Sequence, residues 1–304
     1  MAHRGEKHGE SLASALARAQ AKVEETLAAI LPPAAEGPEG ELFGAMRYAT
    51  LEGGKRLRPF LVVASASLFD VPEAVALRVG AAVELIHSYS LIHDDLPCMD
   101  DDALRRGKPA CHVRFGESTA VLAGDALMPL AFEVLADPAT HPDASVRAAL
   151  VVGLARAAGP RGMVGGQVLD LAAERVDLDV GGIARLERLK TGSLIAFAVD
   201  AGAILGRAPE AERKALAAYA HDLGLAYQMA DDLLDVEGSA GATGKEVGKD
   251  ARRGKATFVA LLGVAQARDQ ARRLAEQAAS HLEPFGPGAG TLRALARYVV
   301  ERPA

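Results

Sequence analysis

The sequence predicts an all-α fold, in which about ten or more helices form a single large domain around a central cavity. Half of the 304 residues are apolar and only 4% are aromatic, and alanine and leucine, both strong helix formers, are abundant. Apolar residues recur at helical spacing along most of the chain. No stretch alternates apolar and polar residues for long enough to predict a β-strand.

Prolines and glycines set the predicted helix boundaries. Leu31-Pro32-Pro33 ends the first helix, because proline lacks a backbone donor and restricts the residue before it. The sequence Gly-Pro-Glu-Gly at 37–40 predicts a turn, and Gly53-Gly54 separates two helices, the second opened by Pro59. The predicted helices are 11–31, 42–51, 59–69, 73–92, 118–135, 145–157, 179–200, 215–229, 258–282 and 290–301.

The composition also argues against several classes of protein. The net charge of −6 disfavours a nucleic-acid partner, and two cysteines, Cys98 and Cys111, exclude a disulfide scaffold. No apolar run approaches the roughly 18 residues of a membrane helix, and the polar residues 1–10 lack the apolar stretch of a signal peptide. We expect a cytoplasmic protein without membrane insertion, made of a mobile leader (1–10) and one domain (11–304).

The chemistry begins with a cluster of five aspartates that fall within nine positions after an apolar helix. Carboxylates packed this closely repel one another, so a cation is needed to offset them. Mg²⁺ is the usual choice, since it binds a few carboxylates together with substrate phosphates. The alternative is a solvated acidic turn. The aspartates are Asp94, Asp95, Asp100, Asp101 and Asp102.

Pro97 interrupts this cluster. On an unbroken helix Asp94 would align with Asp101 and not with Asp100, because six residues turn the helix by about 600°. Pro97 cannot donate to the carbonyl of His93 and clashes with it, so we expect the helix to kink or bulge there.

A second acidic cluster contains Asp231, Asp232 and Asp235. Asp231 and Asp235 are four residues apart and share one face of the predicted helix. Two carboxylate clusters, each at the end of an apolar helix, predict two walls of one cavity. Lysines and arginines from other segments would complete a phosphate site.

A candidate anion site lies at residues 53–59, where a Gly-Gly pair precedes Lys55, Arg56 and Arg58. Free backbone N–H groups at a helix start and basic side chains attract phosphate. The alternative is a solvated basic turn.

Further along, the adjacent Lys190 and Thr191 would be costly to bury without partners. We expect the glycines near 165 to let two helices pack closely. The alternative is that Gln167 and Asp170 support the side chains that bind substrate and metal.

Together these motifs resemble the trans-isoprenyl diphosphate synthases, most closely the bacterial farnesyl diphosphate synthases. The resemblance covers residues 20–302 and implies a homodimer that condenses an allylic diphosphate head-to-tail with isopentenyl diphosphate. A geranylgeranyl diphosphate synthase is the alternative product class. The motifs are GGKRLRP at 53–59, DDLPCMDDDALRRG at 94–107, GGQVLD at 165–170, KTG at 190–192 and YQMADDLLD at 227–235.

The resemblance assigns a role to each candidate residue. It implies Mg²⁺, with Mn²⁺ as a substitute and three ions when substrate is bound, held by Asp94, Asp95, Asp100, Asp231, Asp232 and Asp235. Asp101 is the geometric rival of Asp100. Isopentenyl diphosphate would be bound by Lys55, Arg58, His87 and Arg106. The allylic diphosphate and its developing cation would be contacted by Arg105, Lys190, Thr191, Gln228, Lys245 and Lys255.

Product length is assigned to Tyr89 and Ser90, which precede Asp94 by five and four residues. An aromatic ring at Tyr89 would close the cavity near fifteen carbons, whereas a plain packing role is the alternative. No comparable role emerges for His93. Residues 237–255 are rich in glycine and charge and predict a mobile lid over the second cluster.

Three other functions fit parts of the pattern. A terpene cyclase uses the same ionisation but typically has Asn, Ser and Glu in the second metal motif. A metal phosphohydrolase would use His93-Asp94 but needs further histidines at suitable spacing. A non-catalytic synthase subunit would not need both aspartate clusters intact.

Overall fold

The computed structural model describes residues 11–173, 175–176, 178–237 and 257–301, and it confirms the all-α fold. The first half of the chain forms α1 (Leu12–Ile30), α2 (Pro38–Leu51), α3 (Leu57–Ala66), the 3-10 turn η1 (Ser67–Phe69), α4 (Glu73–Asp94), α5 (Cys111–Phe115), α6 (Glu117–Ala136) and α7 (Ala144–Ala158). The second half forms α8 (Met163–Ala173), α9 (Val180–Glu187), the π-helical turn η2 (Arg188–Gly192), α10 (Ser193–Leu205), α11 (Glu210–Glu237), α14 (Phe258–Leu262), α15 (Val264–His281), the 3-10 segment η3 (Glu283–Ala289) and α16 (Gly290–Glu301).

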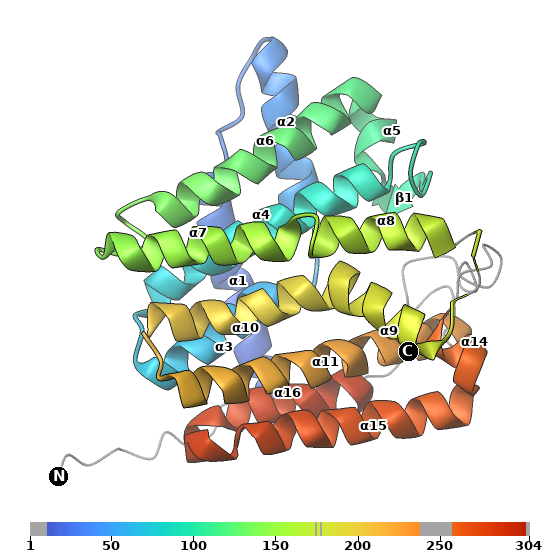
Figure 1. Ribbon diagram of the computed structural model, residues 1–304. Helices are drawn as coiled ribbons and strands as arrows, with labels where there is room; N and C mark the ends of the chain where they lie inside the picture. The colour runs from blue at the N-terminus through green and yellow to red at the C-terminus, as the bar shows by residue number, and fades with distance from the viewer. Residues whose placement is uncertain (1–10, 174, 177, 238–256, 302–304) are drawn as a thin grey trace.

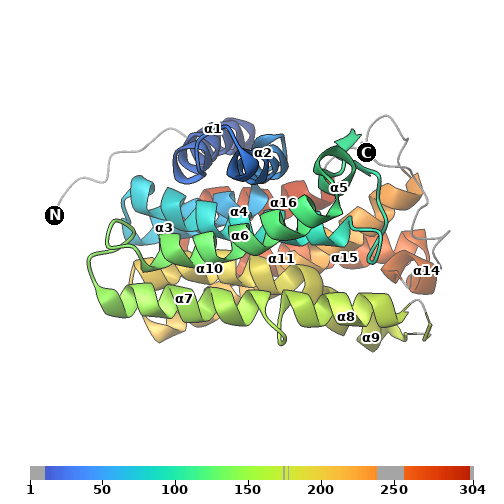
Figure 2. The ribbon, with the colours of Figure 1, turned by 90° about the horizontal axis from the view of Figure 1, so that it is seen from above.

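The core is built around α4 and α10, whose side chains are apolar on nearly every side. Of the 22 residues of α4, 13 are buried, and of the 13 residues of α10, 10 are buried. Figure 2 shows that α1 and α2 cover one side of the molecule, while α7 and α8 lie end to end on the opposite side. Helices with apolar side chains all around fit only in such a central layer.

The two helices that carry the aspartate clusters, α4 and α11, end at the same side of the molecule. In Figure 1, α4 and α11 both run toward the right-hand end, where α8, α9 and α14 also lie. The order of helices therefore brings together segments that are more than a hundred residues apart in the sequence.

Several predicted boundaries were wrong, for local reasons. The turn predicted at 37–40 is the start of α2, where Pro38 takes the first helical position. The negative charge of Glu39 in the first turn interacts favourably with the positive N-terminal end of the helix dipole. The helix predicted at 258–282 is broken at Gly263, which has a φ of 79°. The predicted helix 179–200 consists of three consecutive segments, α9, η2 and α10.

Two short strands were not predicted. Leu104–Arg105 (β1) and Lys108–Pro109 (β2) pair antiparallel around a turn in which Arg106 and Gly107 both have positive φ. Paired strands of two residues are too short for any alternating pattern to reveal. This hairpin follows the first aspartate cluster and fixes the position of the two arginines.

The expected kink at Pro97 was also wrong, because α4 stops at Asp94 instead of bending. The chain then folds back in tight turns, and the backbone N–H of Asp100 donates to the carbonyl of Asp94 at 2.8 Å. Asp101 adopts a left-handed conformation with φ 51° and is exposed. Ending the helix lets Asp100, and not Asp101, return toward Asp94.

Two helices are longer and more apolar than the sequence analysis recognised. By length and composition alone, α4 and α6 would suit a membrane span. In α4, 67% of the apolar window is buried within the fold, whereas in α6 only 39% is buried. The core position of α4 explains its composition, and α6 leaves an apolar face uncovered.

Candidate active site

The first wall of the site is the C-terminal end of α4. Burial raises the pKa of Asp94 to about 6; the positive charge of Lys190 opposes this shift, and the negative charge of Asp100 adds to it. Asp95 is buried beneath them and receives hydrogen bonds of 3.0 and 3.1 Å from Nε of Arg105. The pKa of Asp95 is raised by burial even though Arg105 opposes the shift. This wall therefore holds carboxylates that gain stability from any added cation.

Arg105 and Arg106 leave the hairpin in different directions. Arg105 lies on the carboxylate of Asp95. Burial lowers the pKa of Arg105, but the hydrogen bonds and the charge of Asp95 outweigh burial and leave the pKa raised. Arg106 donates to the carbonyl of Gly53, and its guanidinium lies so close to Gly54 that a Cβ there would be 2.8 Å from Cζ. Gly54, with a φ of 118°, is therefore required by its backbone conformation, and any side chain there would also make the guanidinium of Arg106 shift.

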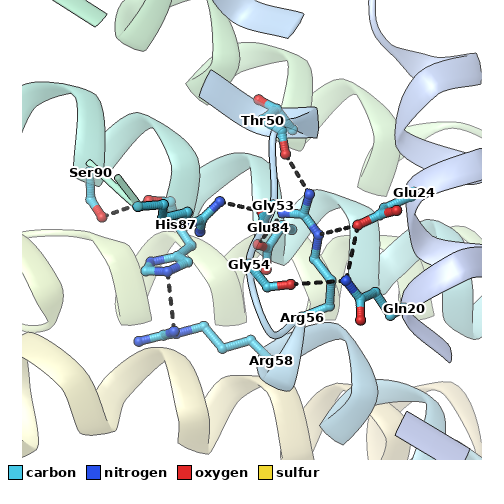
Figure 3. Close-up of polar contacts among 11 residues, drawn as sticks. Gln20, Glu24, Thr50, Gly53, Gly54, Arg56, Arg58, Glu84, His87 and Ser90 are labelled. Atoms are coloured by element: carbon cyan, nitrogen blue, oxygen red, sulfur yellow. Dashed lines mark hydrogen bonds and ion pairs between the residues drawn. The ribbon is translucent and has the colours of Figure 1, made fainter. Parts of the chain in front are cut away.

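A second set of basic side chains, which includes Arg58 and Arg106, lies around His87. Nη1 of Arg58 lies 3.4 Å from Nε2 of His87, and Figure 3 shows the two side chains pointing toward each other. Burial and the charge of Arg58 hold the pKa of His87 well below its usual value, with smaller contributions from Arg106 and Arg105. His87 is neutral at pH 7, so it would meet a phosphate oxygen as an uncharged donor. Lys55 is exposed at the edge of this group.

Arg56 does not belong to this anion site, although the sequence places it among the basic residues. Its side chain is 1% exposed and donates to Glu84 at 2.7 Å, and a second nitrogen donates to the carbonyl of Thr50 at 2.7 Å. Figure 3 shows Arg56 turned toward Glu84, Thr50 and Glu24, away from the Arg58–His87 pair. Its role is to anchor the loop that presents Lys55 and Arg58.

The second wall is a chain of hydrogen bonds that leads from η2 to α11. The hydroxyl of Thr191 donates to Oε1 of Gln228 at 3.3 Å, and the amide of Gln228 donates to Asp232 at 2.9 Å. Asp232, 4% exposed, also accepts from the backbone N–H of Phe258 at 3.0 Å. Each group in this chain is oriented by the next, so the second aspartate cluster and the Lys-Thr pair form one unit.

Lys190 joins the two walls. Its Nζ lies 2.6 Å from Asp170 on α8, and its charge also acts on Asp94 at the end of α4. A Cβ at Gly166 would be 2.2 Å from the backbone nitrogen of Lys190, so the glycine lets α8 approach η2 closely. The close packing expected for these glycines is therefore present, and Asp170 contacts the predicted substrate-binding residue Lys190.

Glu187 is a site residue that the sequence analysis missed. It lies one turn before Thr191, whose hydroxyl is 3.4 Å from its carboxylate. Burial, and then the negative charge of Asp232, raise its pKa to about 8. The spacing of four residues from Thr191 was a signal that could have revealed it.

The remaining predicted residues have less defined positions. Asp231 and Asp235 are half-buried on α11, and the hydroxyl of Ser90 donates back to the carbonyl of His87 at 2.9 Å. The Tyr89 side chain is 6% exposed. Lys245, Lys255 and most of the predicted lid at 237–255 lie outside the described residues.

Within the described part of the chain, no three acidic, histidine or cysteine side chains converge closely enough to hold a metal ion by themselves. The donor set nevertheless suits Mg²⁺, because it consists of carboxylates and the ion normally takes several of its oxygens from water and substrate phosphates. The raised pKa of Asp94 points the same way, since burial and the charges of Asp100 and Asp95 outweigh the opposing charges of Lys190 and Arg105, and a bound cation would offset that excess.

Comparison with known proteins shows the family to which the chain belongs. Residues 39–283 match the family model described as polyprenyl synthetase. The chain belongs to the polyprenyl synthetase family. It is 48% identical over 265 residues to the farnesyl diphosphate synthase of Escherichia coli (strain K12). The aligned region covers 84% of this chain and 88% of that protein.

Two further members of the family show the range of relatives. The chain is 46% identical over 265 residues to geranylgeranyl pyrophosphate synthase 9 of Arabidopsis thaliana, covering 85% of this chain and 73% of the plant protein. The crystal structure of an FPP/GFPP synthase from Zymomonas mobilis superposes with a TM-score of 0.86 at 49% identity, over 95% of this chain and 98% of the other. The family recognised from the sequence motifs and the isoprenoid synthase type of fold are thereby confirmed.

Proposed function

We propose that the protein is a farnesyl diphosphate synthase, which condenses isopentenyl diphosphate head-to-tail with dimethylallyl or geranyl diphosphate. The observation that carries this proposal is the separation of the basic side chains into two groups beside the carboxylates. Arg105 and Lys190 face the aspartates, whereas Arg58, His87 and Arg106 form a second group. Two diphosphates need two such groups, and the relatives named above support the same reaction.

The allylic diphosphate would lie against the first group. Arg105 and Lys190 would bind its oxygens, with the fork of Arg105 suited to two of them at once. Both cations are now paired with carboxylates, Arg105 with Asp95 and Lys190 with Asp170, which hold them in place before substrate arrives. The residues that would hold Mg²⁺ are Asp94, Asp100 and Asp231, supported by Asp95, Asp232 and Asp235.

When bound, as three ions in the proposed complex, Mg²⁺ would neutralise the charge on the departing diphosphate. The C–O bond of the allylic substrate ionises, and the oxygens of Thr191 and Gln228 stabilise the carbocation. Their hydrogen bond fixes both groups before the charge develops.

Isopentenyl diphosphate, held by Lys55, Arg58, His87 and Arg106, presents its double bond to the carbocation. The new C–C bond leaves the positive charge on the isopentenyl part. This part then loses a proton to the released diphosphate, which acts as the base, and a new double bond forms. No side-chain nucleophile takes part, so catalysis comes from positioning and electrostatics.

The fifteen-carbon product follows from Tyr89, whose ring would close the cavity below the metal site. Tyr89 is 6% exposed, and its burial, with a smaller contribution from the charge of Asp94, raises the pKa of its phenol to about 12. The geranylgeranyl synthases among the relatives keep a twenty-carbon product as the second candidate.

A product assay tests the proposal. Purified protein is incubated with Mg²⁺, isopentenyl diphosphate and dimethylallyl or geranyl diphosphate, and the products are measured by mass spectrometry. We expect mainly the fifteen-carbon diphosphate from wild type and a shift to twenty carbons in Tyr89→Ala. A cyclic hydrocarbon, free phosphate alone, or mainly twenty carbons from wild type would each contradict it.

We also propose that the protein is a cytoplasmic homodimer, with α6 at the interface. Leu122 and Pro129 are seven residues apart on α6 and share one exposed face, where Leu122 is 56% exposed and Val121 is 39% exposed. A second copy would cover this apolar face. Size-exclusion chromatography with light scattering should give the mass of a dimer, and Leu122→Lys should give a monomer.

A further inference from the structure

A histidine that the proposed mechanism does not use, His93, lies where α4 packs on α6. Its Nε2 is 3.1 Å from the backbone carbonyl oxygen of Val121. Because a carbonyl oxygen can only accept, Nε2 must carry the proton and donate it. The imidazole is thereby fixed to the backbone of α6, although the residue next to it in the sequence, Asp94, belongs to the metal-binding wall.

Gly124 creates the space that this contact needs. A Cβ at Gly124 would lie 2.1 Å from Nε2 of His93 and 2.6 Å from its Cδ2, which is closer than any real contact. The absence of a side chain thus exposes the carbonyl of Val121, one turn earlier on α6, to a group on α4. Any larger residue at 124 must displace the imidazole.

The other neighbour of the imidazole is Tyr89, one turn earlier on α4. The ring centroids of Tyr89 and His93 are 5.8 Å apart and the ring planes meet at 75°, an edge-to-face arrangement. Tyr89 is thus held on one side by a ring that is itself held by α6. A tyrosine ring can occupy several staggered rotamers, and a fixed neighbour such as His93 favours the one that keeps the edge-to-face contact.

We propose that His93 is a positioning residue for product length, which holds the Tyr89 ring across the end of the chain cavity by linking it to Val121 and Gly124. This inference rests on the proposed function, in which Tyr89 limits the product to fifteen carbons. Without the imidazole, the Tyr89 ring can turn toward α6 into the space beside Gly124. The cavity then becomes deep enough for one more isoprene unit.

The test measures the ratio of twenty-carbon to fifteen-carbon product, with isopentenyl diphosphate in excess, by mass spectrometry. Loss of an edge-to-face pair and of one hydrogen bond predicts that His93→Ala raises this ratio about ten-fold. Gly124→Ala, whose Cβ would push the imidazole away from the carbonyl of Val121, should also raise the ratio, but by less than His93→Ala, because the methyl group occupies part of the space into which the ring would turn. Glu117→Ala, an exposed change at the first residue of the same helix, is the matched control and should leave the ratio at the wild-type value.

A double variant separates positioning from a general loosening of the fold. If His93 acts through Tyr89, then Tyr89→Ala/His93→Ala should give the same ratio as Tyr89→Ala alone, because residues that act through one another are not additive. A ratio well above that of Tyr89→Ala would overturn the proposal. His93→Gln, which keeps a donor for Val121 but no ring, gives the same comparison should His93→Ala fail to fold.

The outcomes distinguish this inference from the function on which it rests. If Tyr89→Ala lengthens the product but His93→Ala and His93→Gln do not, the role of His93 is refuted and the proposed function stands. If Tyr89→Ala leaves the product at fifteen carbons, Tyr89 does not limit the chain, and the assignment of product length fails together with the role of His93.

Discussion

Replacing Arg56 by methionine should destabilise the fold strongly, although Arg56 touches neither diphosphate in the proposed site. Its side chain is 1% exposed and that of Glu84 is 2% exposed, and the two are joined at 2.7 Å. Arg56→Met would leave the carboxylate of Glu84 buried without its cation. Removing one partner of a buried ion pair costs about 3–5 kcal/mol of unfolding free energy.

The expected magnitude depends on burial, and the chain provides a matched control. Glu24 approaches Nε of the same arginine at 3.7 Å but is 37% exposed, so Glu24→Ala should cost about 0–1 kcal/mol. The double change Arg56→Met/Glu84→Leu removes both charges. It should recover most of the loss, since replacing a buried pair with apolar side chains is often neutral or stabilising.

Urea unfolding followed by circular dichroism would measure these differences at fixed protein concentration, because a dimer is expected. Steady-state kinetics on the same proteins would show whether the loop carrying Lys55 and Arg58 still binds isopentenyl diphosphate. If Arg56→Met unfolds at the same urea concentration as Glu24→Ala, the Arg56–Glu84 pair is not the buried anchor described above.

Three further predictions concern the site itself. Asp231→Ala, or removal of Mg²⁺ with EDTA, should lower turnover by about 10²-fold or more, and full activity in EDTA would argue against a metal. Arg106→Ala should raise KM mainly for isopentenyl diphosphate and Arg105→Ala mainly for the allylic substrate; steady-state titrations of each substrate check this, and the reverse pattern would exchange the two subsites. Because the pKa of Glu187 in the fold, about 8, exceeds its ordinary 4.5, stability should fall as the pH rises from about 4.5 to about 8. Glu187→Gln should reduce this fall, measured as unfolding midpoints at pH 6 and pH 9, and an unchanged slope would show that Glu187 is not buried as a neutral acid.

Much of the fold could be predicted from the sequence, because apolar residues at helical spacing decide which segments are helices. The family was recognisable from five short motifs, and family membership confirms the predicted class of prenyltransferase. The assignment of individual residues to metal and substrates stays a prediction. The structure adds where these residues lie and which of them contact one another.

Other features depend on contacts that no local pattern reveals. Arg56 stands among basic residues in the sequence, but a left-handed backbone with φ 47° turns it into the core. The pairing of Lys190 with Asp170 joins residues on two helices, and the hairpin that separates Arg105 from Arg106 rests on two-residue strands. In each case the deciding neighbour is distant in the sequence or the conformation is a single residue long.

The π-helical turn η2 has a consequence for insertions and deletions in this part of the chain. A π-turn holds one residue more than an α-helical turn, so it absorbs an extra residue while α9 and α10 keep nearly the relative orientation of one continuous helix. Deleting one residue between Arg188 and Gly192 would leave a regular α-helical turn and would rotate α10 very little relative to α9. Inserting one further residue would instead rotate α10 by about 100° relative to α9. Since α10 is buried on nearly all sides, that rotation would bring different side-chain volumes against every neighbour. This turn should therefore tolerate a one-residue deletion better than a one-residue insertion.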